Sequence, residues 1–368
     1  MRRSLSDFPE TESKKRKRRQ MAAIDQARPW QTQIYFIARQ EMEHLGIATN
    51  LLASMGEPPY FKRPQFPVPM AYTLMDAPFL LERFNSMSLK TYIWFERPTS
   101  LTSSFPPDYL DRCKHDPDPL GKQIMASTPS TKQLHDAFEK FGISSVEELY
   151  DQIQAAFQNT DIPAAELFKG DTEQQVGDVF GYKVYMKTIT NRVEAAAAID
   201  LIIEQGEGTG LDPLDSEAHF QRFTNMYAEY EASLKSAPKS ALPIALPCLT
   251  NPRTFLEPED PQQETNPCYD VPPSLVRRQS TLNMMTLFND CYNLMMLMLY
   301  DFFDTYQSPD APATAERGSQ AAKFYGAFFP LMTMVIRPLG EILCRIPAGA
   351  PYPNQNAGAA FEIDNALL

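Results

Sequence analysis

A carboxylate and an imidazole interrupt an apolar helical stripe near the start of the chain. Apolar side chains recur at steps of three and four over residues 22–55, which predicts one amphipathic helix. Glu41 and His44 lie one turn apart in the middle of this stripe, whereas Met42 and Glu43 fall outside it. The apolar positions are Ile34, Ile37, Ala38, Leu45, Ala48, Leu52 and Met55. Because an unpaired buried carboxylate is costly, the fold must enclose this helix and give Glu41 a partner.

Two kinds of partner would satisfy Glu41. A metal ion is one, because Glu-x-x-His on a bundle helix is typical of carboxylate-bridged iron or manganese sites. A buried ion pair with an arginine or a histidine is the other, and a four-residue motif does not decide between them. Any imidazole chemistry must use one of four histidines: His44, His115, His135 and His219.

Three further residues are candidate ligands. His219 lies on the apolar side of a helix predicted over residues 217–235, where a core histidine is the alternative. Glu207 follows an Ala-rich helix predicted over residues 193–205, at the edge of its apolar face, and a solvated helix end is the alternative. Asp290, inside a long apolar segment, is a weaker candidate.

The remaining pattern predicts a mostly helical protein. The segment 282–306 is apolar almost all round, which is typical of a helix buried in a bundle. It is long enough to span a bilayer, but an aspartate and two asparagines in its middle favour a soluble core. Other helices are expected over residues 79–95, 131–141 and 144–158, and over 321–345 with breaks at Pro330 and Pro338.

Charge and proline content indicate the domain boundaries. The basic run at residues 14–19 predicts a disordered tail over residues 1–21, with a nuclear-localisation or nucleic-acid-binding tail as the alternative. Residues 22–368 are expected to form one domain that contains a Pro-rich loop at 238–275. The net charge is -12, which argues against nucleic-acid binding by this domain. No membrane partner is expected, and five scattered cysteines without a CxxC pair are expected to be reduced in a cytosolic protein.

Several motifs follow one another in an order that is typical of one family. The matching segments are Glu41-Met42-Glu43-His44, Ser145-Val146-Glu147-Glu148-Leu149-Tyr150, Phe168-Lys169-Gly170-Asp171, Gln205-Gly206-Glu207-Gly208, His219-Phe220-Gln221-Arg222-Phe223 and Arg337-Pro338-Leu339-Gly340. Through them, residues 25–362 resemble the ferritin-like iminophenyl-pyruvate dimer synthase family. That family includes the ferritin-like region of enzymes from the violacein and rebeccamycin pigment pathways.

The resemblance implies a mainly α fold, namely a ferritin-like helical bundle with long Pro-rich loops and extra helices. It implies an iron site held by Glu41, His44, Glu207 and His219, with one metal or two and with manganese as an alternative. Family members begin with an earlier helix that carries a site-facing glutamate, whereas the residues before position 22 are polar and basic here. Haem has been associated with the pigment-pathway group, but no residue in this chain identifies an axial ligand.

Two functions follow from these expectations. The first is an enzyme that performs oxidative chemistry on a small amino-acid-derived molecule, such as the coupling of an imine in secondary metabolism. The second is a degenerate bundle that acts as a non-catalytic binding or assembly protein. Glutamate and histidine at core positions favour the first, because a lost site has no physical reason to keep charged groups in the core. A missing first helix favours the second, and it would leave an apolar groove that another helix or a second subunit of a homo-oligomer would cover.

Overall fold

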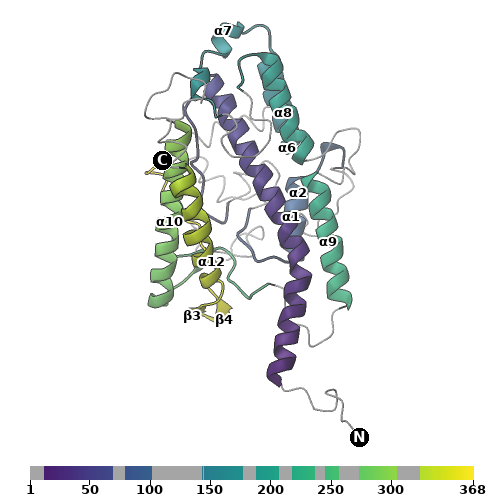
Figure 1. The fold of residues 1–368 in the computed structure, drawn as a ribbon, viewed down its shortest axis with the longest axis vertical. Coiled ribbons are helices and arrows are strands. Elements are labelled where there is room, and N and C mark those ends of the chain that lie inside the picture. Colours follow the sequence, from purple (N-terminus) through teal and green to yellow (C-terminus); the bar gives the residue numbers. More distant parts are fainter. Residues whose placement is uncertain are drawn as a thin grey trace.

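The computed structural model describes residues 12–68, 79–101, 143, 145–176, 188–206, 218–236, 245–256, 273–304 and 324–368. Helices dominate these residues, so the expected mainly α fold is confirmed (Figure 1). The helices are α1 (Glu12–Ser54), α2 (Ser86–Phe95), α6 (Val146–Gln158), α7 (Ala164–Leu167), α8 (Arg192–Gly206), α9 (His219–Ser236), α10 (Gln279–Asp304) and α12 (Arg337–Leu343). Short 3-10 turns occupy Thr99–Leu101 and Thr172–Gln174. The helix expected at residues 131–141 and most of the Pro-rich loop lie outside the described residues.

Helix α1 runs through the middle of the molecule, between α10 with α12 on one side and α8 with α9 on the other (Figure 1). It begins at Glu12 rather than near residue 22, so the structure differs from the disordered tail expected over residues 1–21. No glycine or proline interrupts residues 12–21, and lysine and arginine are good helix formers. Exposed basic side chains are therefore compatible with a helix here, while residues 1–11 lie outside the described part.

The buried face of α1 follows the predicted stripe only in part. Ile37 and His44 are buried, but Ile34 is 37% exposed and Ala38 is exposed as well. The buried positions that best trace this face recur every seven residues, at Trp30, Ile37, His44 and Leu51. Glu43, which was expected outside the stripe, is buried, and its Oε1 lies 3.6 Å from Nε of Arg39. The C-terminal half of α1 has neighbours on several sides, so a single stripe does not describe it.

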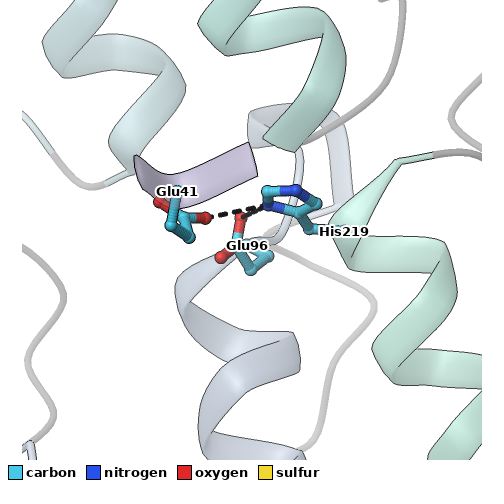
Figure 2. A group of neighbouring side chains, drawn as sticks. All are labelled: Glu41, Glu96 and His219. Atoms are coloured by element: carbon cyan, nitrogen blue, oxygen red, sulfur yellow. Dashed lines mark ion pairs between the residues drawn. The ribbon is translucent and has the colours of Figure 1, made fainter. Parts of the chain in front are cut away.

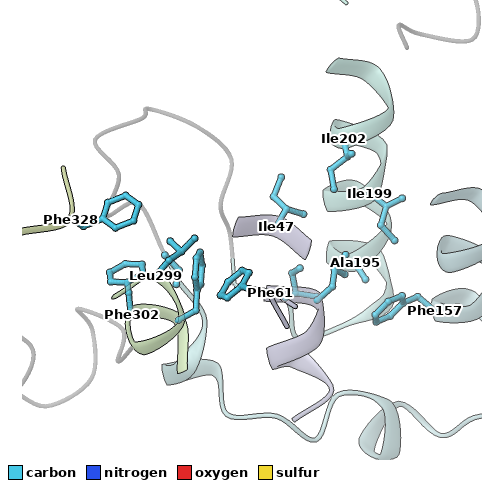
Figure 3. Packing of buried hydrophobic residues seen from close by; sticks show 13 residues of the cluster. Ile47, Phe61, Phe157, Ala195, Ile199, Ile202, Leu299, Phe302 and Phe328 are labelled. Atoms are coloured by element: carbon cyan, nitrogen blue, oxygen red, sulfur yellow. The ribbon is translucent and has the colours of Figure 1, made fainter. Parts of the chain in front are cut away.

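Two apolar clusters pack on successive parts of α1. The first joins its N-terminal half to α2 and α9, through Trp30, Ile37, Leu89, Ile93, Phe220, Phe223 and Met226. The second joins its C-terminal half to α6, α8 and α10, and includes Ile47, Phe157, Ala195, Ile199, Ile202, Leu299 and Phe302 (Figure 3). Glu41 and His44 lie on α1 between the two clusters. His44 is buried, whereas the side chain of Glu41 is 48% exposed, so the structure does not enclose this carboxylate as the sequence predicts.

Side-chain caps determine where two of the helices begin. Ser145 Oγ accepts a hydrogen bond from the backbone N–H of Glu148 at 3.1 Å, as expected for an N-cap at the start of α6. Helix α2 begins at Ser86 rather than at residue 79, because Asn85 caps it by accepting from the backbone N–H groups of Met87 and Ser88.

The polar residues of α10 anchor the C-terminal segment. Asn289 donates its side-chain amide to the Glu362 carboxylate, and Asn293 donates to the Glu362 backbone carbonyl at 3.0 Å. Glu362 also accepts from Nε of the fully buried Arg253 at 2.9 Å. These contacts account for asparagines in an otherwise apolar helix, whereas Asp290 is exposed.

The C-terminal region contains an interrupted helix and a small hairpin. Pro330 lies between π-helical segments at Phe324–Phe328 and Leu331–Ile336, while Pro338 lies in the first turn of α12, where proline is tolerated. Strand β3 (Pro347–Gly349) pairs antiparallel with β4 (Tyr352–Asn356), and β1 (Pro252–Arg253) pairs in parallel with β2 (Ser274–Leu275). Within the described residues, one stretch, Gly326–Leu343, is long and apolar enough to cross a membrane on length and composition.

Candidate metal centre

Glu41, Glu96 and His219 form a compact cluster of potential metal ligands (Figure 2). Nδ1 of His219 lies 2.9 Å from Oε1 of Glu41 and 3.7 Å from Oε2 of Glu96. One ligand atom from each of the three residues lies within 4.8 Å of the other two. Three elements far apart in the sequence meet here, because Glu41 is on α1, Glu96 is the C-cap of α2, and His219 is the first residue of α9.

His44 lies beside this cluster, on the same face of α1 as Glu41. Its Nδ1 is 3.5 Å from Oε2 of Glu41, and the centroid of its ring is 5.5 Å from that of His219. The two oxygens of Glu41 therefore face different imidazoles.

A glutamine side chain forms a hydrogen bond with Nε2 of each imidazole. Nε2 of His44 lies 2.9 Å from Oε1 of Gln205, and Nε2 of His219 lies 3.2 Å from Oε1 of Gln40. An amide oxygen accepts hydrogen bonds only, so each Nε2 carries the proton and donates. In the neutral imidazoles, both Nδ1 lone pairs then point toward Glu41, which is the tautomer that a metal ligand requires.

The charges in the cluster perturb one another. Burial opposes ionisation of Glu41, but the close contacts of its carboxylate with His219 and His44 outweigh this effect and lower the pKa of Glu41 to about 2. Burial would also lower the pKa of His219, but the Glu41 and Glu96 carboxylates raise that pKa to about 9. Burial raises the pKa of Glu96, even though His219 acts in the opposite direction. The metal-free cluster therefore contains an ionised Glu41 paired with a protonated His219.

A cavity of about 150 Å³ adjoins the cluster. Glu41, His44, Glu96 and Glu147 contribute its polar wall, and its apolar wall comes from Phe95, Val146, Ile202 and Ile203. Tyr150 also lines it, and burial together with the nearby Glu41 and Glu96 charges raises the pKa of its hydroxyl to about 12. The tyrosine is therefore neutral and able to donate a hydrogen bond into the cavity.

The donor set fits a divalent first-row metal ion. Carboxylate oxygen and imidazole nitrogen are the ligands that iron and manganese take in helical bundles. Nδ1 of His219 is buried, yet among the described residues it makes no well-aligned hydrogen bond, despite its closeness to Glu41. A buried polar atom of this kind needs an explanation, and a metal bound between Nδ1 and the two carboxylates would supply one.

The structure brings together three of the four residues expected to bind metal: Glu41, His44 and His219. Glu207 lies outside the described residues, directly after the end of α8 at Gly206. The exposed Asp290 is not part of the cluster.

Sequence reasoning missed Glu96. A carboxylate at the C-terminus of a helix opposes the helix dipole, so the acidic residue that ends α2 is a signal that could have identified Glu96. Its C-cap position at the end of α2 is what directs its side chain to the other ligands.

Comparison with known proteins finds one family model and two relatives that match most of the chain. A family model described as "Ferritin-like" matches residues 9–228. Dichlorochromopyrrolate synthase from Lentzea aerocolonigenes is 26% identical over 342 residues, which is 89% of this chain and 29% of that protein. The 2-imino-3-(indol-3-yl)propanoate dimerase from Chromobacterium violaceum is 27% identical over 328 residues, which is 85% of this chain and 26% of that protein.

The chain thus spans less than a third of the length of these curated relatives. No solved structure matches it. The resemblance expected from the motifs is confirmed, because the family match extends over more than half of the residues and both relatives match most of the chain. On this basis the chain belongs to the ferritin-like family.

Proposed function

We propose that this chain is a metal-dependent enzyme of the iminophenyl-pyruvate dimer synthase type, which couples a small amino-acid-derived imine oxidatively in secondary metabolism. The observation that carries the proposal is the buried Nδ1 of His219, which faces two carboxylates beside a small cavity. The relatives support the substrate class, since the name of the Chromobacterium violaceum protein describes the dimerisation of an imino acid and that of the Lentzea aerocolonigenes protein a synthase.

Glu41, Glu96 and His219 would hold the metal, with His44 as a further ligand. Iron is the preferred ion and manganese the alternative, because both are hard enough for carboxylates and accept imidazole. When bound, such an ion supplies one-electron redox chemistry that amino-acid side chains alone do not provide.

The other residues of the site would prepare it for this chemistry. Gln40 and Gln205 orient the two imidazoles through their Nε2 atoms. The apolar wall, which includes Phe95 and Ile202, excludes water from a reactive imine and offers a surface for an aromatic side chain. The neutral Tyr150 hydroxyl is available to orient a polar group of the substrate.

Metal content tests the first half of the proposal. The protein is reconstituted with ferrous iron without oxygen, desalted and examined by elemental analysis, alongside the variants Glu96→Gln and His219→Ala. We expect one or two iron ions per chain in the wild type and a loss of at least half of them in each variant. Glu166 is an exposed glutamate on α7, so Glu166→Gln is the matched control and should retain the metal. Equal metal in all four proteins, or none in the wild type, would contradict the proposal.

Product formation tests the second half. The loaded protein is mixed with 2-imino-3-(indol-3-yl)propanoate and hydrogen peroxide, and the products are read by mass spectrometry. Coupling joins two molecules with loss of two hydrogen atoms, which peroxide takes up as it is reduced to water. We expect a product of twice the monomer mass less two hydrogens, absent with Glu96→Gln. If the protein binds metal but does not form this product, the proposed metal site is retained and the proposed substrate is wrong.

A further inference from the structure

A second cavity, of about 310 Å³, lies in another part of the molecule and shares no lining residue with the metal centre. Its wall is formed by the segment 81–84, the segment 245–249, the end of α12 and residues 358–361. Two of its lining residues are cysteines, Cys248 and Cys344, and both are half-buried with free thiols.

The two cysteines contact each other. The Sγ–H of Cys248 donates to the backbone carbonyl of Cys344 at 3.7 Å, and both thiols line the same cavity. The pair is therefore close enough for direct thiol chemistry, although the residues are far apart in the sequence.

Backbone hydrogen bonds hold the segments that carry the pair. The N–H of Leu249 donates to the carbonyl of Asn356 at 2.9 Å, and the N–H of Asn356 donates to the carbonyl of Pro247 at 2.8 Å. The side-chain amide of Asn356 donates to the carbonyl of Cys344 at 2.7 Å. Asn356 thus bridges the two cysteine-bearing segments and fixes their separation.

The surroundings of the two thiols shift their pKa values in opposite directions. The neighbouring Cys248 thiol, aided by the charge of Arg345, lowers the pKa of Cys344 to about 7 against the effect of burial. The closeness of Cys344 and burial raise the pKa of Cys248. Cys344 is the better nucleophile at neutral pH because the thiolate is the reactive form, and Cys248 remains a thiol beside it.

We propose that Cys248 and Cys344 form a redox-active dithiol, which a hydroperoxide oxidises to an intramolecular disulfide. The Cys344 thiolate attacks the peroxide, the O–O bond breaks, and Cys344 becomes a sulfenic acid as the leaving hydroxide or alkoxide takes up a proton. Cys248 then attacks this sulfur and releases water. The two thiols lose two electrons and the peroxide gains two. The disulfide ties the segment 245–249 to the end of α12, across a loop that contains α10.

The test treats the reduced, metal-free full-length protein with one equivalent of hydrogen peroxide, in chelator so that no metal chemistry contributes. We expect peptide mapping to find a Cys248–Cys344 disulfide in the wild type and in the control Cys291→Ser, and dithiothreitol to reverse it. We expect Cys248→Ser to stop at a sulfenic acid on Cys344, which dimedone traps. The disulfide should raise the melting temperature by several degrees, since it closes a long loop.

Three outcomes would overturn the proposal. They are a disulfide that pairs either cysteine with Cys113 or Cys268, oxidation of Cys291 at the same rate as Cys344, and overoxidation of Cys344 without a disulfide in the wild type. Because chelator is present throughout, failure here leaves the proposed metal function untouched, and failure of metal binding leaves this result unchanged.

Discussion

Glu41 has an unusual position among the residues of the metal centre, because each of its two oxygens faces a different imidazole. Its spacing from His44 is a property of one helix, so the sequence predicts that pair directly. The partners Glu96 and His219 come from other helices, and no spacing rule relates them to Glu41. The sequence identified His219 through its apolar surroundings and a family motif, whereas Glu96 belongs to no such motif.

The glutamine behind each histidine should affect metal affinity without supplying a ligand. We expect Gln205→Ala to weaken iron binding by about 10- to 100-fold, because His44 loses the acceptor that fixes its tautomer. Gln152→Ala, at an exposed position on α6, should bind iron as the wild type does. Competitive titration against a chromophoric chelator measures both constants, and equal values would show that Gln205 does not orient the ligand.

Protonation of His219 should stabilise the metal-free fold. Its pKa rises from 6.5 to about 9 on folding, so the contribution is complete below pH 6.5 and disappears as the pH rises through about 9. We expect the difference in unfolding free energy between wild type and His219→Asn to be largest near pH 6 and smallest near pH 10. Urea denaturation in chelator across this range measures it. A difference that grows with pH would contradict the assigned ion pair with Glu41.

At the scale of elements, the sequence predicted the type and position of most helices well. Periodicity and caps are local signals, which explains the agreement for α6, α8 and α9. The start of α2 was set too early, although the Asn85-x-x-Ser88 capping box that ends the preceding segment is visible in the sequence. The rotation of α1 was less predictable, because burial depends on which neighbours surround it rather than on its own composition.

Gly170 should be indispensable where a loop meets the end of α1. A Cβ at this position would lie 1.8 Å from the backbone carbonyl oxygen of Ala53, and the N–H of Gly170 donates to the carbonyl of Ser54 at 2.9 Å. We expect Gly170→Ala to lower the free energy of unfolding by about 3 kcal/mol, because backbone must move to admit the methyl group. Gly326→Ala is the matched control, since a Cβ there meets no atom within 4 Å. Urea denaturation compares the two, and similar stabilities would show that the loop shifts freely.

At the scale of the whole molecule, the C-terminal segment joins elements that the sequence left unrelated. The buried Arg253 and the Asn289 side chain both bind Glu362, so β1, α10 and the C-terminal segment meet at one carboxylate. The sequence showed the asparagines as exceptions within an apolar helix and could not show their partner. Their pairing is a property of the tertiary fold, about 70 residues apart in the chain.

Removing this carboxylate should destabilise the whole protein. We expect Glu362→Ala to lower the free energy of unfolding by about 3–5 kcal/mol, because Arg253 would remain buried and charged. Glu341→Ala removes exposed ion pairs with Arg337 and Arg345, and should change stability by less than about 1 kcal/mol. Thermal unfolding measures both, and hydrogen exchange should show loss of protection in α10 for Glu362→Ala alone. Equal effects of the two substitutions would contradict the anchoring role.

The central position of α1 also has a consequence for synthesis on the ribosome. Ile47 leaves the ribosome early, but its cluster partners on α10, such as Leu299 and Phe302, are translated far later. At typical elongation rates this delay is about 10 to 50 seconds. During that time the nascent helix presents apolar side chains to water with only part of its final surroundings available. The helix at the centre of the folded molecule is thus translated well before part of the core that packs on it.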